Sequence, residues 1–416
     1  MLACLLAMAS GCGAGADEPG PSGALFPEGV PVRAATVVLE VGEDEGLLLS
    51  SVGGLLRTEA GELLAPDLQQ GLIHVIHGES GELLGHFGQR AEGPGQVVSP
   101  RALGEDAQGR VWVRHQLGAT VFERDGARGD YRPAGRATST FQSPNRVVRH
   151  LSPLVSEGDG VLAPIIMYET RGPEGRDSFT AFGMVRLALL EGDPDGSATL
   201  AWELAPVPDS VVPGVDVIQT DTRRRLTRAP AIGSEQVMRA VASDGRVAES
   251  TGQSYKVQFY SRTGGFVESL EAPDPPVVPL SEAEQESHRE LFPFRDDPAA
   301  PVTAVNYFMP DAKQPLQQLA FDRLNRLWVR LAVPDGSSVK VAHVFNQAGE
   351  LEEVVVWPSE VSLFGRPLLP HHSVDQDMGW GVSHDEFQVP TLVKVEFNPI
   401  SAEERARLDD GLSIPK

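Results

Sequence analysis

Apolar residues occur along this chain in short runs, separated by glycine, proline, asparagine and aspartate. Runs such as Val37–Leu39 and Val354–Val356 alternate only weakly with polar residues, which is typical of strands that are buried on both faces. Nowhere in the body of the chain is there an uninterrupted apolar stretch of the roughly 18 residues that would span a bilayer. The pattern predicts an all-β protein built from many short strands.

One phrase occurs twice with the same internal spacing, at Leu103–Arg114 and at Leu319–Arg330. Both copies read Leu-x-x-Asp-x-x-(Gly/Asn)-Arg-(Val/Leu)-Trp-Val-Arg. The residue at the seventh position, Gly109 or Asn325, tolerates a positive φ, and the apolar residues after it predict a strand. This duplication indicates a repeat architecture, which decides what kind of core the chain can build.

Weaker copies of the turn and strand extend the repeat to six units. The predicted turn positions are Gly61, Gly109, Gly160, Gly245, Asn325 and Gly379. They are separated by 48, 51, 85, 80 and 54 residues, and a propeller blade takes roughly 40–50. The two longer separations predict insertions, at 164–181, 190–230 and 271–315.

Sheets that are apolar on both faces can be buried by stacking around an axis, and such a ring leaves only short, protected edges. The large residues Trp112, Trp328 and Trp380 have similar positions in their units. We expect them to pack between blades rather than to stack on a ligand, with each indole N–H bonded to a carbonyl.

The segment Phe87–Gln96, followed by Asp106–Val113 and Val121–Gly126, resembles the NHL-type propeller proteins of bacterial surfaces, whose linker reads Phe-Gly-Arg-x-Gly-Glu-Gly-Pro-Gly-Glu-Phe. This chain departs from that linker at Gln89, Ala91 and Gln96. The resemblance implies a six-bladed β-propeller (NHL/TolB-like) over residues 31–400. It also implies that an N-terminal strand, 35–41, completes the last blade beside 391–397.

Two segments predict short helices, because Ser281–Leu291 and Ser401–Leu408 both open with Ser-x-x-Glu, in which the two side chains can cap each other's backbone amides. The first lies in the longest insertion and is either a lid over one mouth of the ring or a simple loop helix. The second begins a C-terminal helical tail, 401–416.

The N-terminus, residues 1–12, resembles the end of a lipoprotein signal peptide, in which the cysteine of Ala-Ser-Gly-Cys12 is acylated. Ala9 replaces the usual leucine, and no basic residue precedes the apolar run; a start codon assigned too far downstream would account for the second departure. We expect lipid attachment at Cys12, a flexible tether at 13–30 and an extracytoplasmic body in the bacterial envelope. The other cysteine is Cys4, so the body has no thiol chemistry.

The charge excludes one class of partner. With 58 acidic and 35 basic residues the chain carries a formal charge of −23, which repels nucleic acid. The densest basic cluster, Arg223–Arg225 with Arg228, could dock an acidic partner or lipid headgroups, or could be a surface turn balanced by Asp216 and Asp221.

Candidate metal ligands are few. His74 and His77 lie three apart on a predicted strand, and so point to opposite faces. The side chains of His371 and His372 are expected to diverge. The acidic runs Glu43–Glu45 and Asp296–Asp297 lack the spacing of a calcium loop.

Two other kinds of site are also unsupported. There is no Gly-x-Ser-x-Gly elbow. The glycine-rich loop 88–95 contains Pro94, which lacks an N–H donor, and precedes no predicted helix, so it suits a turn between blades better than a phosphate site.

The sequence therefore predicts an extracytoplasmic, lipid-anchored, monomeric propeller that acts as a non-catalytic platform for a protein or small molecule, with ligand and cofactor unidentified. Two alternatives stay open. One is a metal-dependent hydrolase or lyase (lactonase-like or amidating-lyase-like) with its ion on the axis. The other is a structural scaffold whose channel is plugged by side chains.

We predict that a palmitate analogue labels the protein in its bacterial host and that Cys12→Ser abolishes the labelling, because the thiol of Cys12 is the acylated group. Labelled protein is detected by in-gel fluorescence, from a gene in which any missing upstream codons are restored. An unlabelled wild-type protein would exclude the anchor.

Overall fold

The computed structural model describes residues 24–89, 95–115, 118–126, 129–137, 146–150, 154–157, 160–171, 177–190, 193–204, 207–208, 214–219, 224–230, 237–291, 302–305, 309–366 and 369–412. Within these ranges the chain is mostly strand, with a 3-10 helix, η1 (Glu43–Glu45), and two α-helices, α1 (Glu282–Leu291) and α2 (Ala402–Leu412). No helix of this described part is both long and apolar enough to cross a membrane.

The first two sheets are four-stranded and antiparallel, with strands in chain order. Sheet I consists of β2 (Leu56–Arg57), β3 (Glu62–Asp67), β4 (Leu72–His77) and β5 (Leu83–Phe87). Sheet II consists of β6 (Ala102–Glu105), β7 (Val111–His115), β8 (Gly118–Arg124) and β9 (Tyr131–Ala137). Neighbouring strands are separated by two to six residues, as the repeated turn and strand predict.

Sheet III is larger, because part of the predicted insertions extends its strands. It consists of β10 (Arg146–His150), β11 (Val155–Glu157), β12 (Gly160–Arg171), β13 (Asp177–Leu190), β14 (Asp193–Glu203) and β15 (Val207–Pro208). The remaining insertion strands form a separate small sheet, in which β16 (Gly214–Gln219) lies between β17 (Arg224–Pro230) and β22 (Val302–Val305). The insertions at 190–230 and 271–315 are therefore joined through β16 and β22.

Sheets IV and V return to four strands. Sheet IV consists of β18 (Met238–Val241), β19 (Val247–Ser250), β20 (Lys256–Tyr260) and β21 (Phe266–Glu271). We call β23 (Leu316–Phe321), β24 (Leu327–Leu331), β25 (Val339–Phe345) and β26 (Leu351–Pro358) sheet V; they form one part of a seven-stranded sheet that continues through β1. A two-stranded ribbon, β27 (Gly365–Arg366) and β28 (Leu369–Pro370), follows it.

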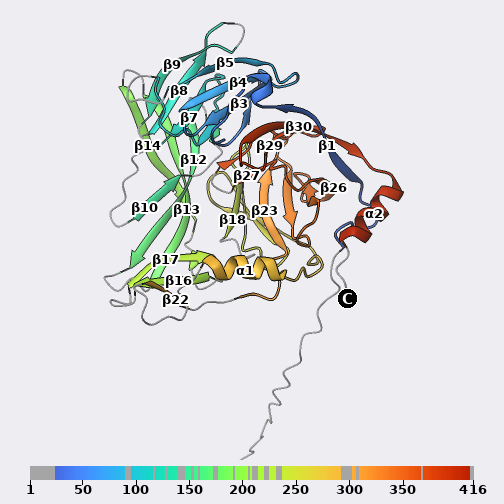
Figure 1. The fold of residues 1–416 in the computed structure, drawn as a ribbon. Helices are drawn as coiled ribbons and strands as arrows, with labels where there is room; N and C mark the ends of the chain where they lie inside the picture. Colours follow the sequence, from blue (N-terminus) through green and yellow to red (C-terminus); the bar gives the residue numbers. More distant parts are fainter. Residues whose placement is uncertain are drawn as a thin grey trace, which may run out of the picture.

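Sheet VI brings the two ends of the chain together. Its strands are β29 (Met378–His384), β30 (Pro390–Pro399) and the N-terminal β1 (Val32–Val41). β1 pairs antiparallel with β30, as expected for a strand beside 391–397, although it begins three residues earlier than predicted. Its first residues also pair in parallel with β26, so that β1 connects sheet V to sheet VI, beside α2 (Figure 1).

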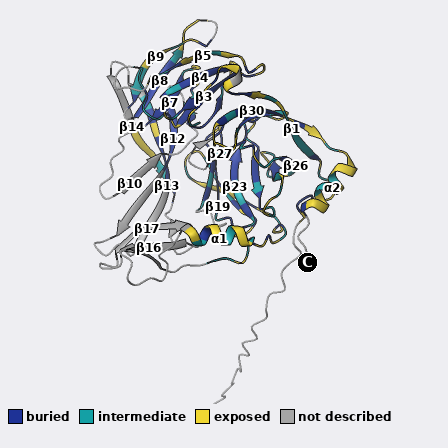
Figure 2. Ribbon diagram, in the orientation of Figure 1, coloured by how far each residue is buried: buried dark blue, intermediate teal, exposed yellow. Residues whose placement is uncertain are grey.

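Alternate residues of each strand face different neighbouring sheets. On β7, Val111 and Val113 pack with sheet I, whereas Trp112 packs with Val161 and Ile165 of sheet III. Equivalent apolar clusters fill the other junctions, III with IV, IV with V, V with VI, and VI with I. The last of these closes the ring, so the fold is an all-β propeller, with buried residues concentrated in its strands (Figure 2).

The three predicted tryptophans fill these junctions, each at most 1% exposed. Trp112 lies between sheets II and III, Trp328 between V and VI, and Trp380 between VI and I. Truncating such a buried ring to alanine typically costs about 3–5 kcal/mol. The packing prediction is confirmed.

The acceptors of the indole N–H groups are only partly as predicted. Trp380 donates to the carbonyl of Gly78 at 2.9 Å, whereas Trp112 and Trp328 donate to the carboxylates of Asp106 and Asp322, at 2.8 and 3.0 Å. A carboxylate is a stronger acceptor than a carbonyl, which explains why the repeat contains both aspartate and tryptophan.

The repeated phrase is a hydrogen-bonded clamp. In the second copy the backbone amide of Arg326 donates to Asp322 Oδ1 at 2.9 Å, and Arg326 Nε donates to Oδ2 at 2.7 Å. The first copy has the same bonds between Arg110 and Asp106. In sheet IV, Ala242 stands at the position of the aspartate and Ala248 at that of the tryptophan. The aspartate and the tryptophan of the clamp are therefore both replaced in that sheet.

Four of the predicted turn positions have a positive φ, namely Gly61, Gly109, Gly245 and Asn325. The other two predictions were wrong. Gly160 is the first residue of β12, and Gly379 lies within β29. At Gly379 an added Cβ would lie 3.1 Å from Val374 Cγ2, so this glycine permits a close approach rather than a turn.

Both predicted helices are confirmed, and both have the predicted reciprocal caps. The amide of Glu284 donates to Ser281 Oγ at 3.1 Å, and that of Ser281 to Glu284 Oε2 at 3.0 Å; Ser401 and Glu404 repeat this pair. α1 is linked to the sheet V side by Lys313, whose Nζ lies 2.6 Å from Glu284 Oε1.

Part of the expected tether packs on the body. The side chains of Leu25 and Phe26 are buried with sheets IV and V. Arg405 of α2 donates to the carbonyls of Phe26 and Pro27 at 2.8 Å. The docked segment begins at residue 24, and residues 1–23 lie outside the described part.

We predict that Asp322→Asn lowers the free energy of unfolding by about 2–4 kcal/mol, because it removes the buried charge that Arg326 and Trp328 share. Urea denaturation followed by tryptophan fluorescence measures the change. The control is Asp244→Asn, whose side chain is 41% exposed and pairs only with Arg246; it should cost at most about 1 kcal/mol. Equal effects of both variants would contradict the clamp.

Candidate functional site

The ends of the innermost strands meet around a cavity of about 250 Å³. Arg57, Glu105 and Ser156 line it from sheets I, II and III. Ser243 and Arg323 follow the first strands of sheets IV and V, and His372 precedes β29 and bridges to Leu56. Because segments from all around the ring contribute, this cavity lies where a propeller has its axis, which is the usual place for a ligand.

The repeat itself places several of these residues. Glu59, Ala107, Ser243 and Arg323 each follow the position of the clamp aspartate in their unit, and all four line the cavity. In units II and V the clamp fixes the backbone at that position, whereas Thr58 and Ala242 stand there in units I and IV. The side chain that follows differs in all four units. The cavity wall therefore combines an acid, a methyl group, a hydroxyl and a cation.

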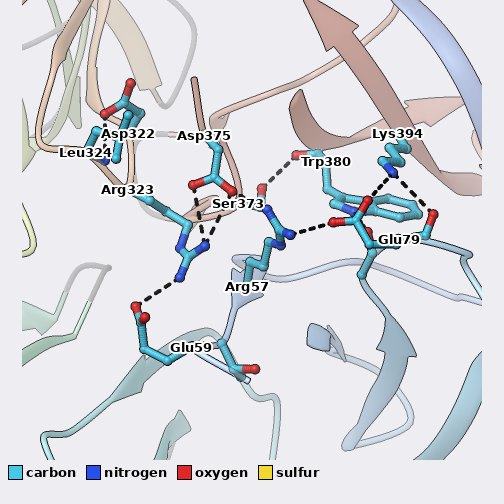
Figure 3. A network of polar contacts seen from close by, with 12 residues as sticks. Arg57, Glu59, Glu79, Asp322, Arg323, Leu324, Ser373, Asp375, Trp380 and Lys394 are labelled. Atoms are coloured by element: carbon cyan, nitrogen blue, oxygen red, sulfur yellow. Dashed lines mark hydrogen bonds and ion pairs between the residues drawn. The ribbon is translucent and has the colours of Figure 1, made fainter. Parts of the chain in front are cut away.

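Ion pairs connect three sheets at this cavity (Figure 3). Arg57 donates to Asp375 and, at 2.7 Å, to Glu79. Arg323 donates to Glu59 at 2.9 Å and lies 3.4 Å from Asp375. The wall is thus cross-linked between sheets I, V and VI.

Two carboxyl groups near the cavity are perturbed in opposite directions. A hydrogen bond from Lys394, at 2.7 Å, lowers the pKa of Glu79. Burial raises the pKa of Glu105, although its Oε2 accepts the amide of Glu59 at 2.8 Å. Burial therefore favours the protonated form of Glu105.

His371 and His372 run beside the inner strand of sheet I. His371 Nδ1 accepts the amide of Leu55 at 3.1 Å, and the amide of His372 donates to the carbonyl of Leu55 at 2.6 Å. Burial lowers the pKa of His371 to about 3 and that of His372 to about 4. Both rings are neutral at pH 7.

The side chains of these two histidines diverge, as predicted. His372 lines the axial cavity, whereas His371 lines a second one of about 260 Å³ between sheets I and VI, together with Ser51 and Val382. His372 Nε2 is buried and has no hydrogen-bond partner among the described residues. This ring nitrogen is thus available to a ligand.

The other predicted pair also points apart. On β4, His74 is buried and His77 is exposed. His77 Nδ1 accepts the amide of Ser80 at 3.1 Å, whereas the His74 ring lies 6.4 Å from that of His86. Burial lowers the pKa of His74.

The remaining candidates do not contribute to this cavity. Glu43–Glu45 form η1, in which Glu45 Oε2 accepts the amide of Gly42 at 2.9 Å. Arg224, Arg225 and Arg228 lie on strand β17 rather than in a turn, and their side chains lie outside the described part.

Several predicted features fall outside the described residues altogether. They are Cys12, Arg223, Asp296, Asp297 and loop residues 90–94.

The donors around the axis do not fit a metal ion. Within the described residues no group of three or more His, Cys, Asp or Glu side chains is arranged to hold one. The carboxylates of Glu59, Glu79 and Asp375 are each bonded to a cation instead. We derive no chemical step through a metal.

Comparison with known proteins identifies no family. No protein-family profile matches the chain, and no curated protein matches it significantly. Solved structures that resemble it include regucalcin, a calcium-binding protein from Agrobacterium tumefaciens, at 11% identity and a TM-score of 0.38, covering 88% of this chain and 96% of that one.

Two further structures have comparable values. A putative exported protein from Bacteroides fragilis is 11% identical with a TM-score of 0.42, over 88% of this chain and 95% of the other. The PQQ-bound aldose sugar dehydrogenase from Streptomyces coelicolor is 12% identical with a TM-score of 0.38, over 88% and 98%. Such low values transfer no function, and the fold assignment rests on the strand pairing and packing described above.

We predict that stability falls as the pH is lowered below His371's ordinary pKa of 6.5. Between that value and about 3 the unfolded chain binds a proton at His371 and the folded chain does not. Such a site contributes a slope of roughly 1.4 kcal/mol per pH unit. In urea denaturation between pH 6 and 5, His371→Asn, whose amide oxygen can still accept the Leu55 amide, should show a slope shallower by this amount. Parallel slopes would contradict the buried neutral ring.

Proposed function

We propose that this protein is an NHL-type, six-bladed propeller, held outside the cytoplasm by a lipid on Cys12, which binds a small polar ligand in the axial cavity without transforming it. One observation supports a binding role most: the residue at one position of the repeat differs in chemistry from unit to unit and lines the cavity. This position, directly after Thr58, Asp106, Ala242 and Asp322, presents Glu59, Ala107, Ser243 and Arg323 to one cavity.

The electrostatics favour binding over catalysis. Arg57, Arg323, Glu59 and Asp375 are engaged with one another or with neighbouring sheets, so their charges are balanced within the wall. The neutral ring of His372 offers its unpartnered Nε2, as a donor or an acceptor according to its tautomer. Such a wall suits a polar ligand of little net charge.

The anchor is consistent with a body held near a membrane. The docked segment begins at residue 24, so eleven residues, 13–23, separate it from Cys12. Fully extended, they would span at most about 40 Å. The ligand site would then stay within a molecular diameter or two of the lipid surface.

We predict that Ala107→Trp blocks the cavity, because Ala107 is exposed and lines it. Saturation-transfer NMR with a library of polar fragments should find binders of the wild type that Ala107→Trp loses. The control, Ala348→Trp, changes an exposed residue of a similar turn outside the cavity and should keep them.

Two results would overturn this proposal. One is that no fragment of the library binds the Ala348→Trp protein while failing to bind the Ala107→Trp protein. The other is one tightly held metal ion per chain in elemental analysis of the same purified protein, with a loss of thermal stability on chelation; it would favour the hydrolase or lyase alternative.

A further inference from the structure

Basic residues cluster at the end of sheet II where β6 begins, opposite to the end that carries Glu105 and the axial cavity. The amide of Arg101 donates to the carbonyl of Arg114 at 2.9 Å. Arg114 stands opposite Ala102 and Ala119, and Arg136 stands opposite Thr120. His115 and Arg136 lie with Thr120 on the other face of the sheet from Arg114, and His115 Nε2 is 3.0 Å from Thr120 Oγ1.

These arginines differ from most others in the molecule. Arg110, Arg239 and Arg326, for example, each have a carboxylate within 2.8 Å. Across the part of the chain that the structure describes, the side chains of Arg101, Arg114 and Arg136 make no hydrogen bond and no ion pair. In a chain with 58 acidic and 35 basic residues, three neighbouring unpaired arginines are not expected from composition.

Arg114 is the most constrained of the three. Its side chain is only 7% exposed, and its Nε is buried without a hydrogen-bond partner. Three alanines, Ala102, Ala119 and Ala137, lie in one cross-strand row with it on the sheet face that Trp112 also occupies. The methyl side chains of these alanines leave room for the Arg114 guanidinium but offer it no hydrogen-bond acceptor.

The charge persists at neutral pH despite this burial. Burial, together with the nearby Arg101, lowers the pKa of Arg114 to about 10, which leaves it protonated at pH 7. Burial, with Arg136 and Arg114 nearby, lowers the pKa of His115 to about 4. A buried, unpaired cation is unfavourable in a folded protein unless an anion accompanies it.

We propose that this end of sheet II is an oxyanion-binding site, at which a phosphate or carboxylate group of a small ligand bonds to the buried guanidinium of Arg114, with Arg101 beside it. A guanidinium presents two parallel N–H donors that match the oxygens of such a group. The net charge of −23 disfavours an extended polyanion but not a small anion drawn to a local basic cluster. This site is separate from the axial cavity.

The test uses pyrophosphate and citrate as probes, each titrated at constant ionic strength while the thermal unfolding midpoint is followed. A ligand of the folded state raises that midpoint with its concentration. We expect at least one probe to stabilise the wild type; pyrophosphate alone would indicate a phosphate group, and citrate alone a carboxylate. A midpoint unaffected by both would overturn the proposal.

Arg114→Gln should weaken binding of the effective probe about tenfold or more. Without ligand the variant should be at least as stable as the wild type, because it removes an unpaired buried charge; a purely structural role would predict the reverse. The control is Arg132→Gln, on the same sheet, which is 61% exposed and paired with Glu123 at 2.7 Å. It should bind as the wild type does.

Undiminished binding by Arg114→Gln would overturn the assignment, as would equal weakening by the control. If Arg114→Gln does not fold, the exposed Arg101 provides the second variant. Arg101→Gln should weaken binding about threefold or more through the lost charge, and unchanged affinity would then count against the site.

Discussion

Each sheet of this protein has two apolar faces, and every face must be covered by a neighbouring sheet. Val111 and Val113 on one side of β7, and Trp112 on the other, show how a single strand serves two junctions. An open stack would leave two apolar faces in water, whereas a ring leaves none. The junction of Trp380 with Leu63 and Ile76 supplies that closure, and the position of every inner strand depends on it.

The sequence predicted the features that arise from local chemistry. The turn of Gly109 and Asn325, the caps at Ser281 and Ser401, and the burial of the tryptophans each depend on neighbouring residues, and all were confirmed. The wrong turn positions, Gly160 and Gly379, were predicted from the two weakest copies of the repeat, in which glycine precedes an apolar strand. Glycine also allows close backbone approach, and only the tertiary contacts distinguish the two uses.

The axial site was harder to predict, because its residues come from distant units. Arg57 and Asp375 are 318 positions apart, and no spacing in the chain relates them. One signal was present in the repeat, since Glu59, Ala107, Ser243 and Arg323 occupy one position of it. The identical residues of the phrase form the clamp, whereas the variable residue that follows Asp106 or Asp322 lines the cavity.

The clamp also explains why the two proposed binding regions lie at opposite ends of β6. It occupies the turn after that strand, where Asp106 fixes Arg110 and Trp112 and consumes their charge and donor groups. The arginine that ends the same phrase, Arg114, lies beyond its reach. Its counterpart Arg330 contacts the carbonyl of Gln317 at 3.4 Å, whereas Arg114 is buried and has no partner among the described residues. In sheet II the same phrase therefore contains Arg110, which is paired with Asp106 at one end of the sheet, and Arg114, which has no partner among the described residues at the other.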